Sequence, residues 1–292
     1  MDIISSFEPE SCTWTYLVAD ESSSRAVIID PVWVYDAVSG TADTTFIDGV
    51  LQIAKEKAYQ IEWVLETHAH ADHLTAADYL KTKTGARIAV GKGICEVQAT
   101  VCKIFDLKNT RCDGGQFDRL LCEENKITLG ELEILVMETP GHTSDSIAFL
   151  VEDSIFIGDT LFSPTLGSAR CDFPGGDAGQ LFDSIQRIYS LPDNTRLFLC
   201  HDYPDSGEKA IDCVPLMDSK KNNIHVFTET TKAEFVSMRN KRDRNLTLPR
   251  LIMPSLQVNI RAGKAPAPSE NGVSYLSMPF NTSIPSILDF QS

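Results

Sequence analysis

Two features of the sequence predict a mixed α/β fold. Short apolar runs rich in β-branched residues alternate with segments whose apolar residues recur at helical spacing, as in proteins whose sheets are covered by helices. Four of the apolar runs are followed within a few residues by histidine or aspartate. A chain of 292 residues, 42% of them hydrophobic, is long enough to bury a large core. We therefore expect one large domain, or one domain with an appendage.

The first third of the chain alternates between strands and helices. The polar segment 20–24 separates the first two strands as a hairpin, and Pro31, which cannot donate a ladder hydrogen bond, ends the second. Gly85 follows the second helix, where glycine is common because it adopts the left-handed conformation easily. In order, the expected elements are strands 12–19 and 25–30, helix 46–57, strand 61–66, helix 74–84, strand 87–90 and helix 93–105.

Strands dominate the middle of the chain. After a polar, glycine-containing loop at 108–116, residues 117–121, 126–129 and 131–138 are expected to form a meander, with Gly130 in a turn. Residues 146–151 and 154–157 are expected to form a hairpin around Glu152 and Asp153. The remaining elements are an amphipathic helix at 181–189, an apolar strand at 196–200 and a charged helix at 232–244.

The C-terminal segment has a different composition. Prolines recur from residue 248 onward, at positions 249, 254, 266, 268, 279 and 285. Because proline interrupts both helices and sheet ladders, we expect a mostly extended tail that wraps the domain, with frayed residues at 283–292. The predicted organisation is a domain at 1–247 followed by an extension at 248–292.

Composition excludes some classes of partner. The net charge of −15, from 26 Lys and Arg against 41 Asp and Glu, argues against nucleic acid or an anionic membrane surface. No apolar run approaches membrane-spanning length. The first eight residues lack the features of a secretory signal or transit peptide, so we expect a cytoplasmic protein and leave a mitochondrial location open. The eight cysteines form no CxxC pair and are expected to be reduced thiols, several of them buried.

The segment 67–73, Thr-His-Ala-His-Ala-Asp-His, holds the densest group of metal-ligand residues. His68 and His70 lie two residues apart, so on an extended chain they point to the same side. A turn would then bring Asp72 and His73 round from a second direction. Imidazole nitrogens and a carboxylate at one rim predict a divalent metal site.

Three further strand ends supply matching ligands. The runs 134–137, 155–157 and 197–199 lead to His142, Asp159 and His201. Gly141 and Gly158 each precede one of these residues and allow a sharp turn. Ligands on loops held by rigid strands are how a scaffold sets metal geometry, so we expect these strand ends to converge. His225 is the one histidine expected to stay outside, as an ordinary surface residue.

These segments resemble the metallo-β-lactamase superfamily. The matching pieces are His68 to His73, Pro140-Gly141-His142-Thr143, Gly158-Asp159-Thr160 and His201. The resemblance covers about residues 1 to 281. It implies an α/β protein with the αβ/βα four-layer sandwich fold and a metal site at one edge of the paired sheets.

A finer resemblance is to the persulfide dioxygenases, closest to their bacterial single-domain type. It rests on the segments 65–68, 169–175, 200–203 and 256–261, and on 271–276 in the tail. The resemblance implies one Fe(II) per chain, held by His68, His142 and Asp159 with open positions for substrate and oxygen. The implied reaction oxidises glutathione persulfide with O₂ and water to sulfite and glutathione.

The resemblance also suggests residues that bind substrate. Arg170 would bind a glutathione carboxylate, with a structural pairing to Asp172 as the alternative. Tyr203 would donate to substrate or orient a ligand, with a buried structural role as the alternative, and Arg261 would close the pocket from the tail. Cys171 is expected to be an ordinary buried cysteine.

The ligand set leaves other functions open. His70, Asp72, His73 and His201 either surround the iron or hold a second metal, so two Zn or mixed metals are the alternative cofactors. A glyoxalase II-like thioester hydrolase would use such a pair. A non-enzymatic metal or persulfide sensor is a further alternative. The oligomeric state is not determined by the sequence, and a homodimer is one option.

Overall fold

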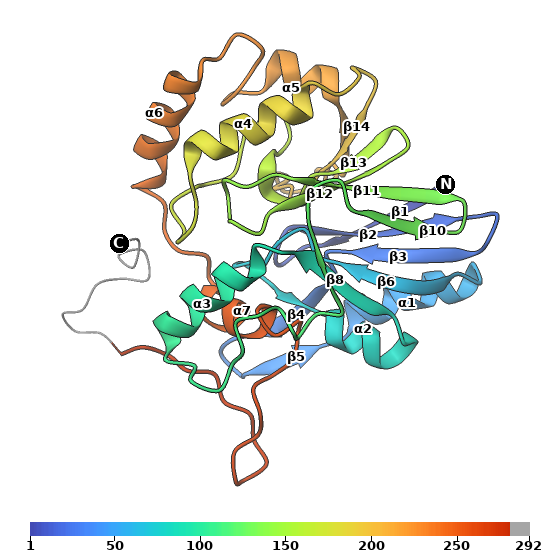
Figure 1. Ribbon diagram of the computed structural model, residues 1–292, viewed down its shortest axis with the longest axis vertical. Coiled ribbons are helices and arrows are strands. Elements are labelled where there is room, and N and C mark those ends of the chain that lie inside the picture. Colours follow the sequence, from blue (N-terminus) through green and yellow to red (C-terminus); the bar gives the residue numbers. More distant parts are fainter. Residues whose placement is uncertain (281–292) are drawn as a thin grey trace.

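Two six-stranded sheets face each other in the computed structural model, which describes residues 1–280 (Figure 1). The first sheet, in spatial order, contains β1 (Asp2–Glu8), β2 (Thr13–Asp20), β3 (Arg25–Ile29), β6 (Gln60–Leu65), β8 (Arg87–Gly91) and β9 (Arg119–Leu121). The second contains β10 (Lys126–Leu129), β11 (Leu132–Glu138), β12 (Ile147–Val151), β13 (Ser154–Phe156), β14 (Arg196–Phe198) and β15 (Cys213–Pro215). A small third sheet has the order β5 (Thr41–Asp43), β4 (Val32–Asp36) and β7 (Leu74–Thr75).

Helices cover the outer face of each sheet (Figure 1). On the first sheet these are α1 (Thr45–Glu56), α2 (Ala77–Thr84) and α3 (Ile94–Phe105). On the second they are α4 (Ala178–Tyr189), α5 (Leu216–Asn222) and α6 (Lys232–Asp243). The layers therefore run helix, sheet, sheet, helix, and the expected αβ/βα four-layer sandwich is confirmed.

Strand alternation builds the layers. On β2, Trp14, Tyr16 and Val18 face the second sheet, whereas Leu17 and Ala19 pack under the helices of the first. Because successive side chains on a strand point to opposite faces, a strand buried on both sides must be apolar throughout. This explains why the predicted strands appear as continuous apolar runs.

Three expected elements differ from the structure. The helix expected at 74–84 begins only at Ala77, because Leu74 and Thr75 pair with β4 as strand β7. The strand expected to open a meander, β9, instead pairs in parallel with β8 in the first sheet. The tail expected to be extended contains a helix, α7 (Ile252–Asn259), which accommodates Pro254 in its first turn. The fraying expected at 283–292 lies outside the described residues.

Several short elements were not predicted from the sequence. These are β1, β4, β5, β15 and α5. Strand β1 is half-buried along most of its length and pairs with β2 at the sheet edge, so it lacks the apolar run that marks an inner strand. None of the helices among residues 1–280 has both the length and the hydropathy needed to cross a membrane.

The core between the sheets supplies a stability prediction. Phe149 on β12 is fully buried there, and its replacement by alanine should lower the free energy of unfolding by about 3–5 kcal/mol because a large cavity remains. Denaturant unfolding followed by circular dichroism measures this. The control, Val38→Ala, removes a side chain that is 97% exposed and should change the value by less than about 0.5 kcal/mol. Equal effects of the two substitutions would contradict this description of the core.

Candidate metal centre

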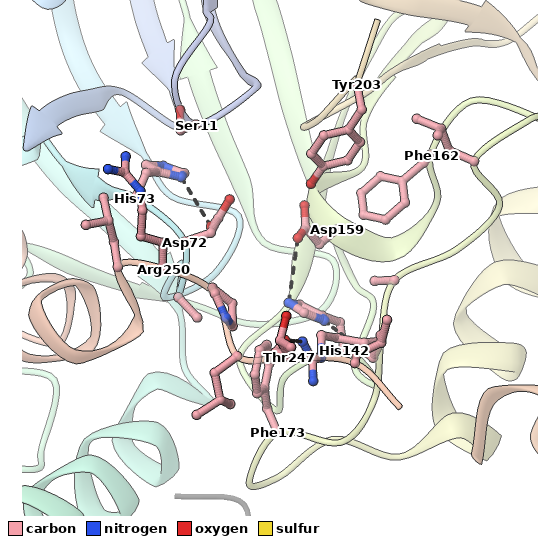
Figure 2. Close-up of a pocket in the computed structure, with 18 of the residues that line it drawn as sticks. Ser11, Asp72, His73, His142, Asp159, Phe162, Phe173, Tyr203, Thr247 and Arg250 are labelled. Atoms are coloured by element: carbon pink, nitrogen blue, oxygen red, sulfur yellow. Dashed lines mark hydrogen bonds and ion pairs between the residues drawn. The ribbon is translucent and has the colours of Figure 1, made fainter. Parts of the chain in front are cut away.

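Strands from both sheets end at one point (Figure 2). The residues after β6 carry His68 to His73, those after β11 carry His142, those after β13 carry Asp159 and those after β14 carry His201. All these histidines are buried. The predicted convergence of four strand ends is therefore present in the structure.

Two glycines allow the strand ends to approach this closely. Gly141 has a φ of +137°, and a Cβ there would lie 2.2 Å from the Leu181 backbone nitrogen on α4. Gly158 has a φ of +51°, and a Cβ there would lie 2.7 Å from the Thr67 hydroxyl. Any side chain at either position would displace the adjacent ligand residue.

The first ligand group consists of His68, His142 and Asp159, whose ligand atoms lie within 4.8 Å of one another. His142 Nδ1 donates to the Arg170 carbonyl at 2.7 Å, which leaves its Nε2 as the lone-pair nitrogen. His68 Nδ1 lies 3.0 Å from the Thr67 hydroxyl, which itself donates to Asp30. The Thr67 oxygen therefore accepts from Nδ1, and Nε2 of His68 is the free acceptor.

The second group consists of His70, Asp72, His73 and His201, which meet the same 4.8 Å criterion. Asp72 lies 3.2 Å from His201 Nε2 and 3.4 Å from His73 Nδ1. Asp159 lies between the groups, with one oxygen 3.7 Å from His142 Nε2 and the other 3.3 Å from His201 Nε2. The arrangement thus offers adjacent positions for one cation or two.

The donor atoms fit a cation. Nε2 of His68, His73 and His201 and Oδ1 of Asp159 are buried and form no hydrogen bond with the described residues, although His201 Nε2 and Asp159 Oδ1 lie 3.3 Å apart. Buried polar atoms are normally paired, so this cluster of unpaired ligand atoms fits a bound cation. Imidazole nitrogens with carboxylate oxygens suit Fe, Zn and similar divalent ions.

Electrostatics support the same conclusion. Burial lowers the pKa of His68 well below its usual range, so the ring is neutral and can ligate a metal. Burial alone would lower the pKa of His201, but the Asp159 and Asp72 carboxylates outweigh it and raise that pKa. For Asp72, burial would raise the pKa, and the neighbouring His201 and His73 lower it instead. The site therefore favours positive charge between these carboxylates.

Three buried polar residues hold the 67–75 segment in place. Asp30 accepts from the Thr67 backbone and hydroxyl at 2.8 Å, and Asp145 accepts from the Ala69 nitrogen at 2.8 Å. Asn259 on α7 donates to the carbonyls of His70 and His73, both at 2.8 Å, and accepts from the Thr75 nitrogen. No sequence pattern indicated a role for any of the three; Asn259 lies within the 256–261 segment that carried the finer resemblance.

A cavity of about 510 Å³ opens above the ligands. Asp72, His73, His142 and Asp159 lie in its wall (Figure 2). Its other lining comes from the β1–β2 loop, strand β4, the loop after β13 and the segment before α7, and includes Glu10, Ser11, Trp33, Tyr35, Phe162, Leu166, Phe173, Thr247, Leu248 and Arg250. This volume lies in the range of sites for small ligands.

Two of the residues predicted to bind substrate, Arg170 and Tyr203, line the cavity, but they differ in the bonds that they already make. Arg170 lines the cavity, yet its guanidinium is held by Asp172 at 2.6 and 2.7 Å and by the Thr247 carbonyl at 2.7 Å. The structural pairing is thus present, and carboxylate binding by Arg170 stays a prediction. Tyr203 also lines the cavity, is 53% exposed and stacks on His201. Its hydroxyl points toward Asp159 (Figure 2).

Other residues lie away from the ligands. Arg261 is not among the residues lining the cavity; it donates to Thr110 at 2.8 Å and to the Gln257 carbonyl, so the structure does not show it closing the pocket. His225 is half-buried and accepts from the Ser168 nitrogen at 2.9 Å, so it is a structural residue at the cavity wall rather than an ordinary surface histidine. Cys171 is buried, and burial raises the pKa of its thiol.

The fold and the site together define a metal-binding αβ/βα sandwich protein. Residues 13–201 match the metallo-beta-lactamase superfamily, and the chain belongs to that superfamily. It is 42% identical over 286 residues to a "probable metallo-hydrolase" of Burkholderia pseudomallei, with 94% of this chain and 97% of the relative covered. It is 40% identical over 277 residues to "glyoxylase B2" of Dictyostelium discoideum, with 94% and 95% covered.

The chain is also similar to proteins named as persulfide dioxygenases. It is 28% identical over 266 residues to mouse "persulfide dioxygenase ETHE1, mitochondrial", with 90% of this chain and 89% of the relative covered. The crystal structure of ETHE1 from Myxococcus xanthus superimposes with a TM-score of 0.73 at 30% identity, covering 90% of this chain and all of that one.

The position of Asn259 yields a second prediction. Asn259→Ala removes two bonds to the ligand-bearing segment and leaves its buried carbonyls unpaired. We expect metal affinity to fall about 10- to 100-fold and the free energy of unfolding to fall by about 1–3 kcal/mol. Metal titration and denaturant unfolding measure the two effects. Asn245→Ala, at an exposed position, is the matched control and should change neither. Unaltered metal affinity in Asn259→Ala would show that α7 does not position the ligands.

Proposed function

We propose that the protein is an iron-dependent persulfide dioxygenase that oxidises glutathione persulfide with O₂ and water to sulfite and glutathione. The observation that carries the proposal is the group of His68, His142 and Asp159. Two histidines and one carboxylate are the ligand set of mononuclear iron oxygenases, which leaves positions for two reactants. The similarity to the ETHE1 proteins along nine-tenths of the chain supports it.

The residues prepare this site in a specific way. Bound Fe(II) would supply the redox chemistry, because it can accept both a sulfur ligand and dioxygen, which Zn(II) cannot activate. The Thr67 hydroxyl and the Arg170 carbonyl fix His68 and His142 in the form whose Nε2 carries the lone pair. A metal would thus meet ligands that need no reorganisation.

The cavity suits an anionic tripeptide. Glutathione carries two carboxylates, and a chain of net charge −15 needs local cations to bind it. Arg170, Arg242 and Arg250 line the cavity. Arg170 still has N–H groups beyond those bonded to Asp172 and Thr247. Partial burial and the Asp159 carboxylate raise the pKa of Tyr203, so its hydroxyl stays protonated and can donate to substrate.

A specific observation favours a second candidate, a glyoxalase II-like thioester hydrolase. The His70, Asp72, His73 and His201 group lies beside the first, with Asp159 between them, as two metal ions sharing one carboxylate would require. The relatives named metallo-hydrolase and glyoxylase B2 support the same candidate. In that case the two groups together would hold a zinc or mixed-metal pair, with one ion at each group, rather than one iron at the first group alone.

Metal content and oxygen uptake together separate the candidates. Protein purified without oxygen should contain about one iron per chain and consume O₂ when glutathione persulfide is added. Asp159→Ala should lose the iron, because it removes the carboxylate of the triad; Asp153→Ala, at the β12–β13 turn, is the matched control and should retain it. Two zinc ions per chain, with thioester hydrolysis and no O₂ uptake, would refute the dioxygenase and support the hydrolase.

Arg170 provides a test of substrate binding. Arg170→Ala should raise KM for glutathione persulfide about tenfold or more with a smaller effect on kcat, because it removes a cation that can bind a carboxylate. Steady-state O₂ uptake gives both constants. Arg187→Ala, which breaks a surface pair with Glu123, is the control and should leave KM unchanged. A normal KM in Arg170→Ala would assign Arg170 to its bonds with Asp172 and Thr247 alone.

A further inference from the structure

A second, smaller cavity lies between α3 and α7, beneath the segment that carries the histidines. Its volume is about 40 Å³. Half-buried side chains on both helices form part of its wall, and the rest includes buried residues of the helices and of the ligand-bearing loops, so it extends from near the surface toward the metal centre. The lining residues are Ala69, Ala71, Val97, Thr100, Val101, Ile104, Thr143, Phe173, Pro174, Ile252 and Leu256.

This cavity is built to exclude water. Its wall is almost entirely aliphatic and aromatic carbon, and the Thr143 hydroxyl is already paired with Ser146 at 2.6 Å. A buried water needs about two to four polar partners, whereas the only other hydroxyl side chain among the lining residues is Thr100. The volume admits a small diatomic molecule and is far too small for a peptide. An apolar gas is therefore the ligand class that it suits.

The cavity also adjoins the metal centre. Ala71 and Phe173 line both this cavity and the larger one above the ligands. The Phe173 ring packs edge-on against His142 with 5.6 Å between ring centroids, and the Arg170 guanidinium carbon lies 4.7 Å from the centroid of the Phe173 ring. The Phe173 ring and the Ala71 methyl group thus lie between the apolar cavity and the larger cavity that contains His142. Figure 2 shows Phe173 beside His142.

We propose that the cavity between α3 and α7 is the holding site and passage for dioxygen. The proposal rests on the proposed dioxygenase function, which supplies dioxygen as a reactant. Dioxygen is small and apolar, so it partitions into such a cavity, whereas the charged persulfide is restricted to the larger polar opening. Phe173 then has no role in the chemical step itself. Its ring separates dioxygen in the cavity from the metal centre, and dioxygen passes when the ring rotates.

Separate routes have a kinetic consequence. A tripeptide persulfide seated in the 510 Å³ cavity would cover the metal from that side and obstruct a second reactant arriving the same way. A route between α3 and α7 reaches the site from the opposite side of Phe173. Dioxygen can therefore reach the site after the persulfide has bound.

Filling the passage tests the proposal. Val97 is half-buried and Val101 is buried on α3, and phenylalanine at either position would occupy the cavity. Val97→Phe and Val101→Phe should raise KM for O₂ about fivefold or more, with KM for glutathione persulfide and iron content unchanged. Val38→Phe makes the same change at a position that is 97% exposed and should leave all three values unchanged. If Val101→Phe fails to fold, Val97→Phe decides the test.

Xenon supplies a measurement that needs no turnover. Crystals of the wild-type protein under xenon pressure should show xenon beside Val101, Phe173 and Ile252, and crystals of Val97→Phe should not. Active enzyme with an unchanged KM for O₂ in the folded variants, or wild-type crystals without xenon, would refute the passage and leave the dioxygenase intact. Wild-type enzyme that binds xenon but consumes no O₂ would refute both proposals, because the cavity would have no reactant to deliver.

Discussion

Several unpaired ligand atoms are buried at one point, and the rest of the structure is arranged around that constraint. Nε2 of His68, His73 and His201 and Oδ1 of Asp159 have no hydrogen-bond partner among residues 1–280. Leaving such atoms unpaired is unfavourable, and a bound cation would offset the cost. The surroundings therefore hold the ligands rigidly: four strands from two sheets end there, and Nδ1 of both His68 and His142 is hydrogen-bonded.

The C-terminal segment is part of this arrangement. Helix α7 packs against α3, and its Asn259 holds the backbone between His70 and Thr75. The same packing leaves the apolar cavity beneath the ligands and places the segment before α7 in the wall of the larger cavity. One helix near the chain's end thus contributes to metal geometry and to both openings. This is a physical reason for the 256–261 segment to accompany the histidine motif.

Much of the fold, and the convergence of the candidate ligand residues, could be predicted from the sequence. Inner strands buried on both faces leave a continuous apolar run, and a histidine or aspartate shortly after such a run is placed by the strand. Edge strands, very short strands and the C-terminal helix had weaker patterns in the sequence. Strand β1 is half-buried and was not predicted, β7 has two residues and was predicted as part of a helix, and α7 contains a proline in its first turn and was predicted to be extended. Their pairing and packing depend on partners that are distant in the chain.

The sequence by itself determined the residue types of the metal centre and the order in which strands present them, because both follow from local alternation and from the turns at Gly141 and Gly158. Tertiary structure decided what surrounds those residues. In the folded chain, Arg170 donates to Asp172 and Thr247, Arg261 is not among the residues that line the cavity, and Phe173 packs against His142. The physical reason is that a side chain's partners depend on the packing of whole elements, which no local pattern encodes.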